Sequence, residues 1–140
     1  MQTYGIKLKP GVNELLKYCK ENDIITAVAT ATPTENAKKH LEKIGIADMF
    51  FKIVGGDSIE NGKPAPDIYL KAARELCLET ESCIALEDSP NGIIAAFSAG
   101  CKPIMIPDLT EPTEELKPLL YDCLPTLFNV IDILKREKGE

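Results

Sequence analysis

The period of the hydrophobic positions changes along the chain, and the changes divide it into elements. Apolar residues at 12, 15, 16 and 19 have the spacing of an amphipathic helix, which we predict over residues 11–22. A continuous apolar run rich in β-branched residues follows at 24–30. Such a run is typical of a parallel strand that is buried on both faces.

A helix start signal comes directly after this strand. Thr32 is the expected N-cap, Pro33 the first helical residue, and Glu35 lies three residues after the cap. Ala37, Leu41 and Ile44 would then face the core. The sequence therefore predicts a strand that leads straight into a helix.

The same strand and helix pattern repeats to the end of the chain. We predict strands at 50–54, 83–86 and 103–106, helices at 67–78 and 90–99, and a closing helix marked by Leu127, Val130, Ile131 and Leu134. This alternation predicts βαβ crossovers and a three-layer, Rossmann-like α/β fold around a parallel sheet. No linker or internal repeat is evident, so residues 1–140 are expected to form one domain, with ligands at the carboxyl ends of the strands.

Composition narrows the possible partners. The formal charge of -6 argues against nucleic acid and anionic membranes, because such a surface repels phosphate backbones. Five cysteines without a CxxC pair suit a reducing compartment. No apolar run is long enough for a membrane span and the N-terminus lacks a signal peptide pattern, so we expect a cytoplasmic protein.

The first loop with possible chemistry holds Thr30, Ala31 and Thr32. A hydroxyl at a strand end meets the free N–H groups of a helix N-terminus here, which is a possible site for a phosphate oxygen. The alternative is a threonine that only caps the helix.

The second loop runs from Gly62 to Asp67. Pro64 and Pro66 restrict the backbone here and hold Lys63 extended, so that its side chain can reach across the end of the sheet. The alternative is a solvated lysine in a turn. The earlier Gly55-Gly56-Asp57 segment is interpreted as a turn without a catalytic role.

The third loop begins with two carboxylates, Glu87 and Asp88, at the end of an apolar strand. Ser89 is the expected N-cap of the next helix and Pro90 its first residue. Two adjacent anions call for a cation, and hard oxygen ligands suit Mg²⁺. The alternative is an exposed acidic turn.

Together these segments resemble the haloacid dehalogenase superfamily, in the branch of β-phosphoglucomutase-like and phosphoglycolate phosphatase-like enzymes. The resemblance spans residues 8–134. Its markers are Lys9-Pro10-Gly11, Ala29-Thr30-Ala31-Thr32, Gly62-Lys63-Pro64-Ala65-Pro66-Asp67, and Glu87-Asp88-Ser89-Pro90-Asn91-Gly92 with Ala95, Ala96, Ala99 and Gly100.

The resemblance implies roles for individual residues. Thr30 and the Ala31 backbone would bind the phosphoryl group, and Lys63 would neutralise phosphate and nucleophile, which makes Thr30 and Lys63 the catalytic candidates. Glu87 and Asp88 would hold Mg²⁺, with Asn91 supporting the site from the next turn. The implied activity is Mg²⁺-dependent phosphohydrolase or phosphomutase chemistry on a small phosphorylated metabolite, through an aspartyl phosphate.

One part of the family pattern is missing from this sequence. The attacking aspartate of the family stands in an Asp-x-Asp motif on a first strand, and this chain contains no Asp-x-Asp pair and no helical cap segment. One hypothesis is a C-terminal piece of such an enzyme, inactive alone. The other is a non-catalytic module that binds phosphate and Mg²⁺ or a partner protein.

In the family that this chain resembles, the first strand lies between the strand that ends at Thr30 and the one that ends at Glu87, so its absence would leave a central gap between them. We expect the gap to be filled by Gln2 to Leu8, where Tyr4, Ile6 and Leu8 alternate with polar or small residues, or by a neighbouring chain in a homodimer. A separate strand-completing partner chain, or closure of the flanking strands onto each other, are the other outcomes considered.

Overall fold

The computed structural model of the protein describes residues 10–107, 112–137 and 139. Its helices are α1 (Val12–Glu21), α2 (Thr34–Lys43), α3 (Asp67–Glu75), α4 (Pro90–Ala99) and α5 (Leu127–Glu137). Its strands are β1 (Ala27–Ala29), β2 (Lys52–Val54), β3 (Ile84–Glu87), β4 (Lys102–Met105) and β5 (Asp122–Cys123). Short 3-10 turns at Ala47–Met49, Gly56–Ser58, Thr80–Ser82 and Lys117–Leu119 complete the element order.

The elements lie where the sequence predicts them, but several boundaries differ. The first predicted strand begins late, because Asp23 adopts a positive φ and the Ile24 N–H still bonds to the Cys19 carbonyl of α1. Helix α3 ends at Glu75, three residues early, since Cys77 also has a positive φ. Strand β5 is only two residues long and carries no periodic signal from which it could be predicted.

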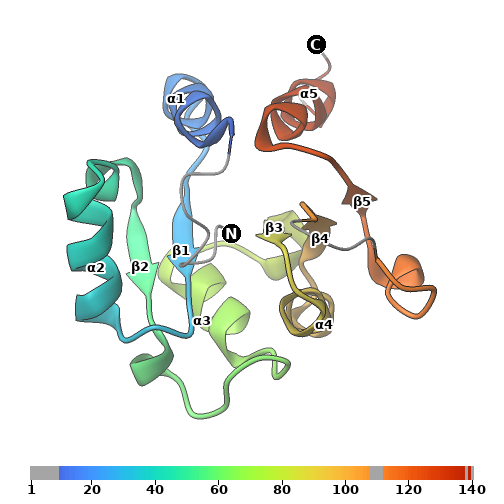
Figure 1. The fold of residues 1–140 in the computed structure, drawn as a ribbon, viewed down its shortest axis with the longest axis horizontal. Coiled ribbons are helices and arrows are strands. Elements are labelled where there is room, and N and C mark those ends of the chain that lie inside the picture. The colour runs from blue at the N-terminus through green and yellow to red at the C-terminus, as the bar shows by residue number, and fades with distance from the viewer. Residues whose placement is uncertain (1–9, 108–111, 138, 140) are drawn as a thin grey trace.

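The strands form the middle of three layers (Figure 1), with α1 and α5 on one face and α3 and α4 on the other. On the first face Val28, Leu86 and Ile104 join the core of α1 and α5. On the second, Ala29 and Ala85 pack with residues of α3 and α4. The predicted three-layer α/β architecture with parallel strands is confirmed.

The strands of the described residues form two separate parallel sheets. Strand β1 pairs with β2, and β3 pairs with β4, which pairs with β5. No hydrogen-bonded pairing links β1 to β3 in the described structure. Closure of the flanking strands onto each other therefore does not occur. The predicted filling by Gln2 to Leu8 lies outside the described residues.

A cavity of about 280 Å³ lies along the facing strands β1 and β3. Helices α1 and α5 line it on one side with Leu15, Cys19, Val130 and Leu134. Helix α3 lines it on the other with Tyr69, Ala72 and Ala73, together with its C-cap residue Leu76. Its walls are therefore apolar in both helical layers.

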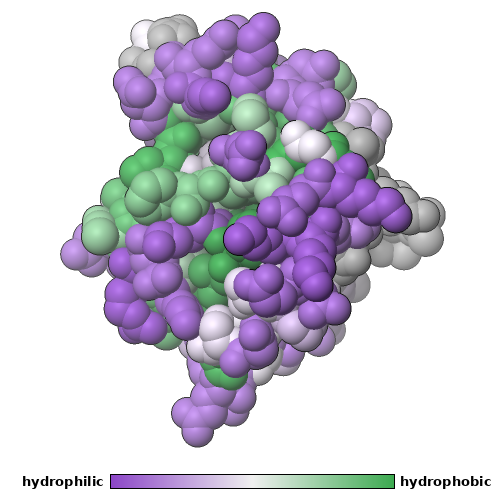
Figure 2. All heavy atoms as spheres, turned by 90° about the vertical axis from the view of Figure 1, so that its left-hand side faces the viewer, coloured by the Kyte–Doolittle hydropathy of each residue, from purple (hydrophilic) through white to green (hydrophobic). Residues whose placement is uncertain are grey.

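The opposite edge of the smaller sheet is formed by β2. Figure 2 shows the molecule from the side of α2 and β2, where hydrophobic surface lies among hydrophilic side chains. The strand has only three residues, and exposed Lys52 stands on it beside Phe51, which is 62% exposed. A short edge strand that carries a lysine discourages pairing with another sheet. Among the described helices, none is long and apolar enough to cross a membrane.

Candidate functional site

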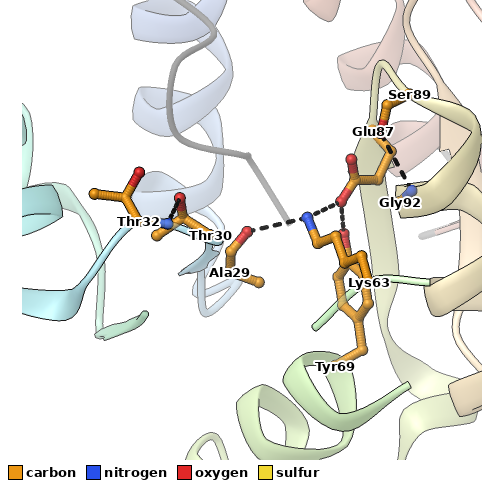
Figure 3. A network of polar contacts seen from close by, with 8 residues as sticks. All are labelled: Ala29, Thr30, Thr32, Lys63, Tyr69, Glu87, Ser89 and Gly92. Carbon is orange, nitrogen blue, oxygen red and sulfur yellow. Dashed lines mark hydrogen bonds and ion pairs between the residues drawn. The ribbon is translucent and has the colours of Figure 1, made fainter. Parts of the chain in front are cut away.

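A buried ion pair joins two of the predicted site residues (Figure 3). The Lys63 ammonium lies 2.5 Å from Glu87 Oε2 and 3.5 Å from the carbonyl oxygen of Ala29, the last residue of β1. The Lys63 side chain is 11% exposed and the Glu87 side chain is fully buried. Lys63 is therefore not a solvated turn residue, and it lies across the ends of β1 and β3.

The loop before α3 places this lysine. Its peptide bond to Pro64 is cis, and the Ala65 N–H bonds to the Gly62 carbonyl in a tight turn. Pro66 then stands at the N-cap position of α3. The prolines noted in the sequence thus lie in the turn beside Lys63 and at the start of α3.

Tyr69 of α3 is a third member of this cluster and was not predicted. Its buried phenol donates a hydrogen bond to the same Glu87 oxygen that Lys63 contacts. Burial, together with the charge and the hydrogen bond of Glu87, raises the pKa of Tyr69 well above its ordinary value. The sequence offered one signal for this contact, a tyrosine on the apolar face of a predicted helix. A buried phenol requires a hydrogen-bond partner, so such a tyrosine indicates a polar group nearby.

The first turn of α4 closes the cluster. Ser89 is the N-cap, as predicted, and its Oγ accepts the Gly92 N–H at 3.2 Å. A Cβ atom on Gly92 would overlap the Glu87 carboxyl group. Only glycine allows the helix to approach this carboxylate so closely.

Thr30 lies at the end of β1, on the other side of Lys63. Its side chain is buried, and its Oγ1 accepts the Thr32 N–H at 3.1 Å. The hydroxyl donates no hydrogen bond to another described residue. Ala31, the next residue, is exposed.

The predicted N-cap of α2 is wrong. Thr32 precedes the cap position, which Pro33 occupies without a side-chain bond. The acceptor comes from another loop, since Asp57 Oδ1 accepts both the N–H and the hydroxyl of Thr34 at 2.8 Å. These bonds lower the pKa of Asp57 below its ordinary value of 3.8. The predicted turn at Gly55-Gly56-Asp57 is present, and its aspartate caps a helix that lacks a cap of its own.

The two remaining site candidates are less enclosed. Asp88 is half-buried, and Asn91 is exposed on the first turn of α4 without a hydrogen bond to another described residue. The support predicted for Asn91 stays a prediction.

The adjacent carboxylates of Glu87 and Asp88 offer some of the oxygen ligands that an Mg²⁺ ion requires. Within the described residues, no cluster of three or more potential metal-ligating residues (histidine, cysteine, aspartate or glutamate) is present. Mg²⁺ is commonly held by one or two carboxylates while water and substrate phosphate supply its other ligands. Half-buried Asp88 fits that pattern, whereas the neighbouring Glu87 carboxylate is buried and already contacts Lys63 and Tyr69.

The fold and this cluster define a class of protein, the parallel α/β proteins with a polar site at the carboxyl ends of the strands. The chain belongs to the haloacid dehalogenase-like hydrolase family, whose family model matches residues 1–106. The family resemblance expected from the motifs is confirmed.

Individual relatives agree with this assignment. The bifunctional riboflavin kinase/FMN phosphatase of Arabidopsis thaliana is 33% identical over 95% of this chain and 34% of its own length. The phosphorylated carbohydrates phosphatase of Thermotoga maritima is 39% identical over 71% of this chain and 46% of its own length. The crystal structure of β-phosphoglucomutase from Clostridium difficile has a TM-score of 0.78 at 28% identity, covering 93% of this chain and 55% of that one. This chain thus spans less than half the length of these two curated relatives and about half of that solved structure.

Proposed function

We propose that the Lys63–Glu87 cluster is the phosphate-binding part of a haloacid dehalogenase-type phosphatase or phosphomutase acting on a small phosphorylated metabolite. The observation that carries the proposal is the position of the Lys63 ammonium across the ends of β1 and β3. Phosphoryl transfer depends mostly on positioning and charge neutralisation, and a fixed buried ammonium supplies both.

Each site residue has a role in this proposal. The Thr30 hydroxyl donates to a phosphate oxygen, because it donates to no other described residue, and the exposed Ala31 backbone offers an N–H beside it. Lys63 neutralises the phosphate charge. Tyr69 and Gly92 fix the Glu87 carboxylate against which Lys63 is held.

Glu87 and Asp88 would hold Mg²⁺, and Asn91 would steady the loop that carries them. A bound Mg²⁺ would neutralise charge on the phosphoryl oxygens. Asp88 is the more accessible of the two carboxylates, so its side chain is the one that would contact a water-bearing Mg²⁺ ion.

The test is binding of inorganic phosphate to the whole chain, by isothermal titration calorimetry with and without MgCl₂. We expect binding that strengthens with Mg²⁺, weakens about tenfold or more in Thr30→Val, and loses its Mg²⁺ dependence in Asp88→Asn. Lys71→Met is the control, since the Lys71 ammonium donates to the Ser58 carbonyl, outside the Lys63–Glu87 cluster. Equal binding by Thr30→Val and the unmodified chain would contradict the proposal.

Turnover is a separate measurement. We expect the chain to hydrolyse a phosphomonoester no faster than background, because its sequence contains no Asp-x-Asp pair and a cooperating site without its nucleophile lacks most of the acceleration. Turnover well above background would contradict this expectation.

A further inference from the structure

The turn after β2 (residues 55–57) lies against the loop after β1 (residues 30–33), which carries two residues of the proposed phosphate site. The Gly56 N–H donates to the Thr32 carbonyl at 3.0 Å. Thr32 in turn donates its own N–H to the Thr30 hydroxyl oxygen at 3.1 Å (Figure 3). Two consecutive hydrogen bonds therefore lead from the turn to the side chain that is proposed to bind phosphate.

The two glycines of this turn allow a close approach to the loop. Neither has a positive φ, and Gly55 is extended, with φ -98° and ψ 167°, so other residues could adopt its backbone angles. A Cβ atom on Gly55 would lie 2.3 Å from the Thr34 nitrogen, and one on Gly56 would lie 2.3 Å from the Ala31 carbonyl oxygen. Both distances are far below van der Waals contact, so a side chain at either position would push the loop away.

Thr34, the first residue of α2, joins the turn to the far end of the loop. Its hydroxyl accepts the Gly55 N–H at 3.1 Å and donates to Asp57 Oδ1 at 2.8 Å. The same carboxylate oxygen accepts the Thr34 N–H at 2.8 Å. The turn therefore holds the chain on both sides of Pro33, through a backbone carbonyl before it and a side chain after it.

The loop needs such contacts because it has no regular structure of its own. Residues 30–33 lie between the end of β1 and the start of α2, and Ala31 is exposed. A segment of this kind stays in one conformation only as far as its neighbours hold it. Donors that are held in place before binding lose less conformational freedom when they bind, so their position affects the affinity for phosphate.

We propose that the turn after β2 positions the phosphate site, and that the Thr34 hydroxyl is the side chain through which it acts. Thr34 is a positioning residue: it fixes the loop that offers Thr30 and Ala31 to phosphate, and it does not touch phosphate itself. The inference rests on the function proposed above. It gives the Gly55-Gly56-Asp57 segment a role in binding, where the sequence predicted a turn alone.

Three variants separate this role from a general effect on stability. Thr34→Val removes the hydroxyl and keeps the branched side chain, whereas Thr34→Ser keeps the hydroxyl. Thr34 is only half-buried, so both variants should fold. Thr26→Val is the matched control, because the buried Thr26 hydroxyl also donates one hydrogen bond, to the Met49 carbonyl at 2.9 Å, but at the other end of β1.

The first measurement needs no phosphate. Because the Thr32 N–H donates to the Thr30 hydroxyl, its amide resonance in NMR spectra reports on the conformation of the loop. We expect this resonance to shift in Thr34→Val and in Gly56→Ala, and to stay in place in Thr26→Val. An unchanged Thr32 resonance in Thr34→Val and Gly56→Ala would overturn the proposal.

The second measurement is the affinity of the whole chain for inorganic phosphate with MgCl₂, by isothermal titration calorimetry. We expect Thr34→Val to bind about fivefold more weakly or worse, and Thr34→Ser and Thr26→Val to stay within about twofold of the unmodified chain. A merely structural role would make affinity follow stability in urea, so Thr26→Val would lose as much. Equal binding by Thr34→Val and the unmodified chain, or no rescue by Thr34→Ser, would overturn this proposal alone. An unmodified chain that binds no phosphate would overturn the proposed function together with it.

Discussion

At the scale of single residues, the site is organised around one carboxylate. Lys63 and Tyr69 both contact Glu87 Oε2, and Gly92 packs against the same group. A buried carboxylate is costly unless it is paired and hydrogen-bonded. Each of these neighbours is therefore expected to influence stability as well as function.

Tyr69→Phe tests this expectation, because it removes the phenol and keeps the ring. We expect a loss of roughly 1–3 kcal/mol in the free energy of unfolding, measured with urea, since a buried charged acceptor loses a donor. Tyr121→Phe is the matched control: that phenol also bonds to a glutamate, Glu137, but the residue is 42% exposed. Its loss should stay below about 1 kcal/mol. Equal losses would mean that the Tyr69 bond contributes no more than a surface contact.

The sequence predicted part of this cluster. Lys63 and Glu87 stand in loops at strand ends, where residue type and position point to chemistry. Tyr69 was missed because a helical tyrosine among apolar positions is indistinguishable from a core residue until its partner is known. The tertiary contact, 18 residues along the chain, supplies that information.

At the scale of elements, α2 depends on a residue outside itself. Asp57 accepts both polar hydrogens of Thr34 at the helix start. A negative charge there also interacts favourably with the helix dipole. The loop after β2 and the helix after β1 are thus tied together.

We expect Asp57→Ala to lower the midpoint of thermal unfolding at neutral pH. The folded-state pKa of Asp57 is lowered, so its contribution is present above the ordinary value of 3.8 and is lost as the pH falls through the folded-state value. The difference between the variant and the unmodified chain should therefore shrink in a series from about pH 7 to about pH 2. Asp48→Ala, at an exposed aspartate in a 3-10 turn, is the control and should leave the unfolding midpoint at neutral pH nearly unchanged.

Helix α4 provides a second test at this scale. Gly92→Ala places a methyl group against the Glu87 carboxyl group, so we expect a loss of about 1–3 kcal/mol in the free energy of unfolding. In Gly62→Ala the new methyl group would have no atom of the described residues within 4 Å beyond its chain neighbours, so stability should change by less than about 0.5 kcal/mol. A Gly92→Ala protein as stable as the unmodified chain would show that α4 can move away from Glu87 without cost.

The elements were more predictable than their ends. The start of α4 at Pro90 follows from Ser89 and Pro90, whose cap chemistry is local. The start of α2 does not follow from its neighbouring residues, because the capping residue Asp57 lies 23 residues after Thr34, in another loop. Boundaries set by local residues can be read from the sequence, whereas those set by tertiary contacts cannot.

At the scale of the whole molecule, the two sheets share their helical layers without sharing hydrogen bonds between β1 and β3 in the described structure. The alternation of strands and helices predicted the layers. The division of the sheet followed from the family resemblance alone, since no periodicity in one chain shows where another strand would lie.

Cysteine thiols line the cavity along β1 and β3, and the rate at which they are alkylated would report how often the cavity opens to solvent. Cys19, Cys83 and Cys101 line it, and burial raises the pKa of Cys19 and of Cys101 to about 11. At pH 8, about one in a thousand of such thiols is ionised, so alkylation by iodoacetamide should be slow wherever the walls stay closed. Exposed Cys77 serves as the internal standard within the same molecule. Mass spectrometry of the labelled peptides then gives the alkylation rate of each cysteine. If Cys19 and Cys101 react as fast as Cys77, the cavity walls are open most of the time.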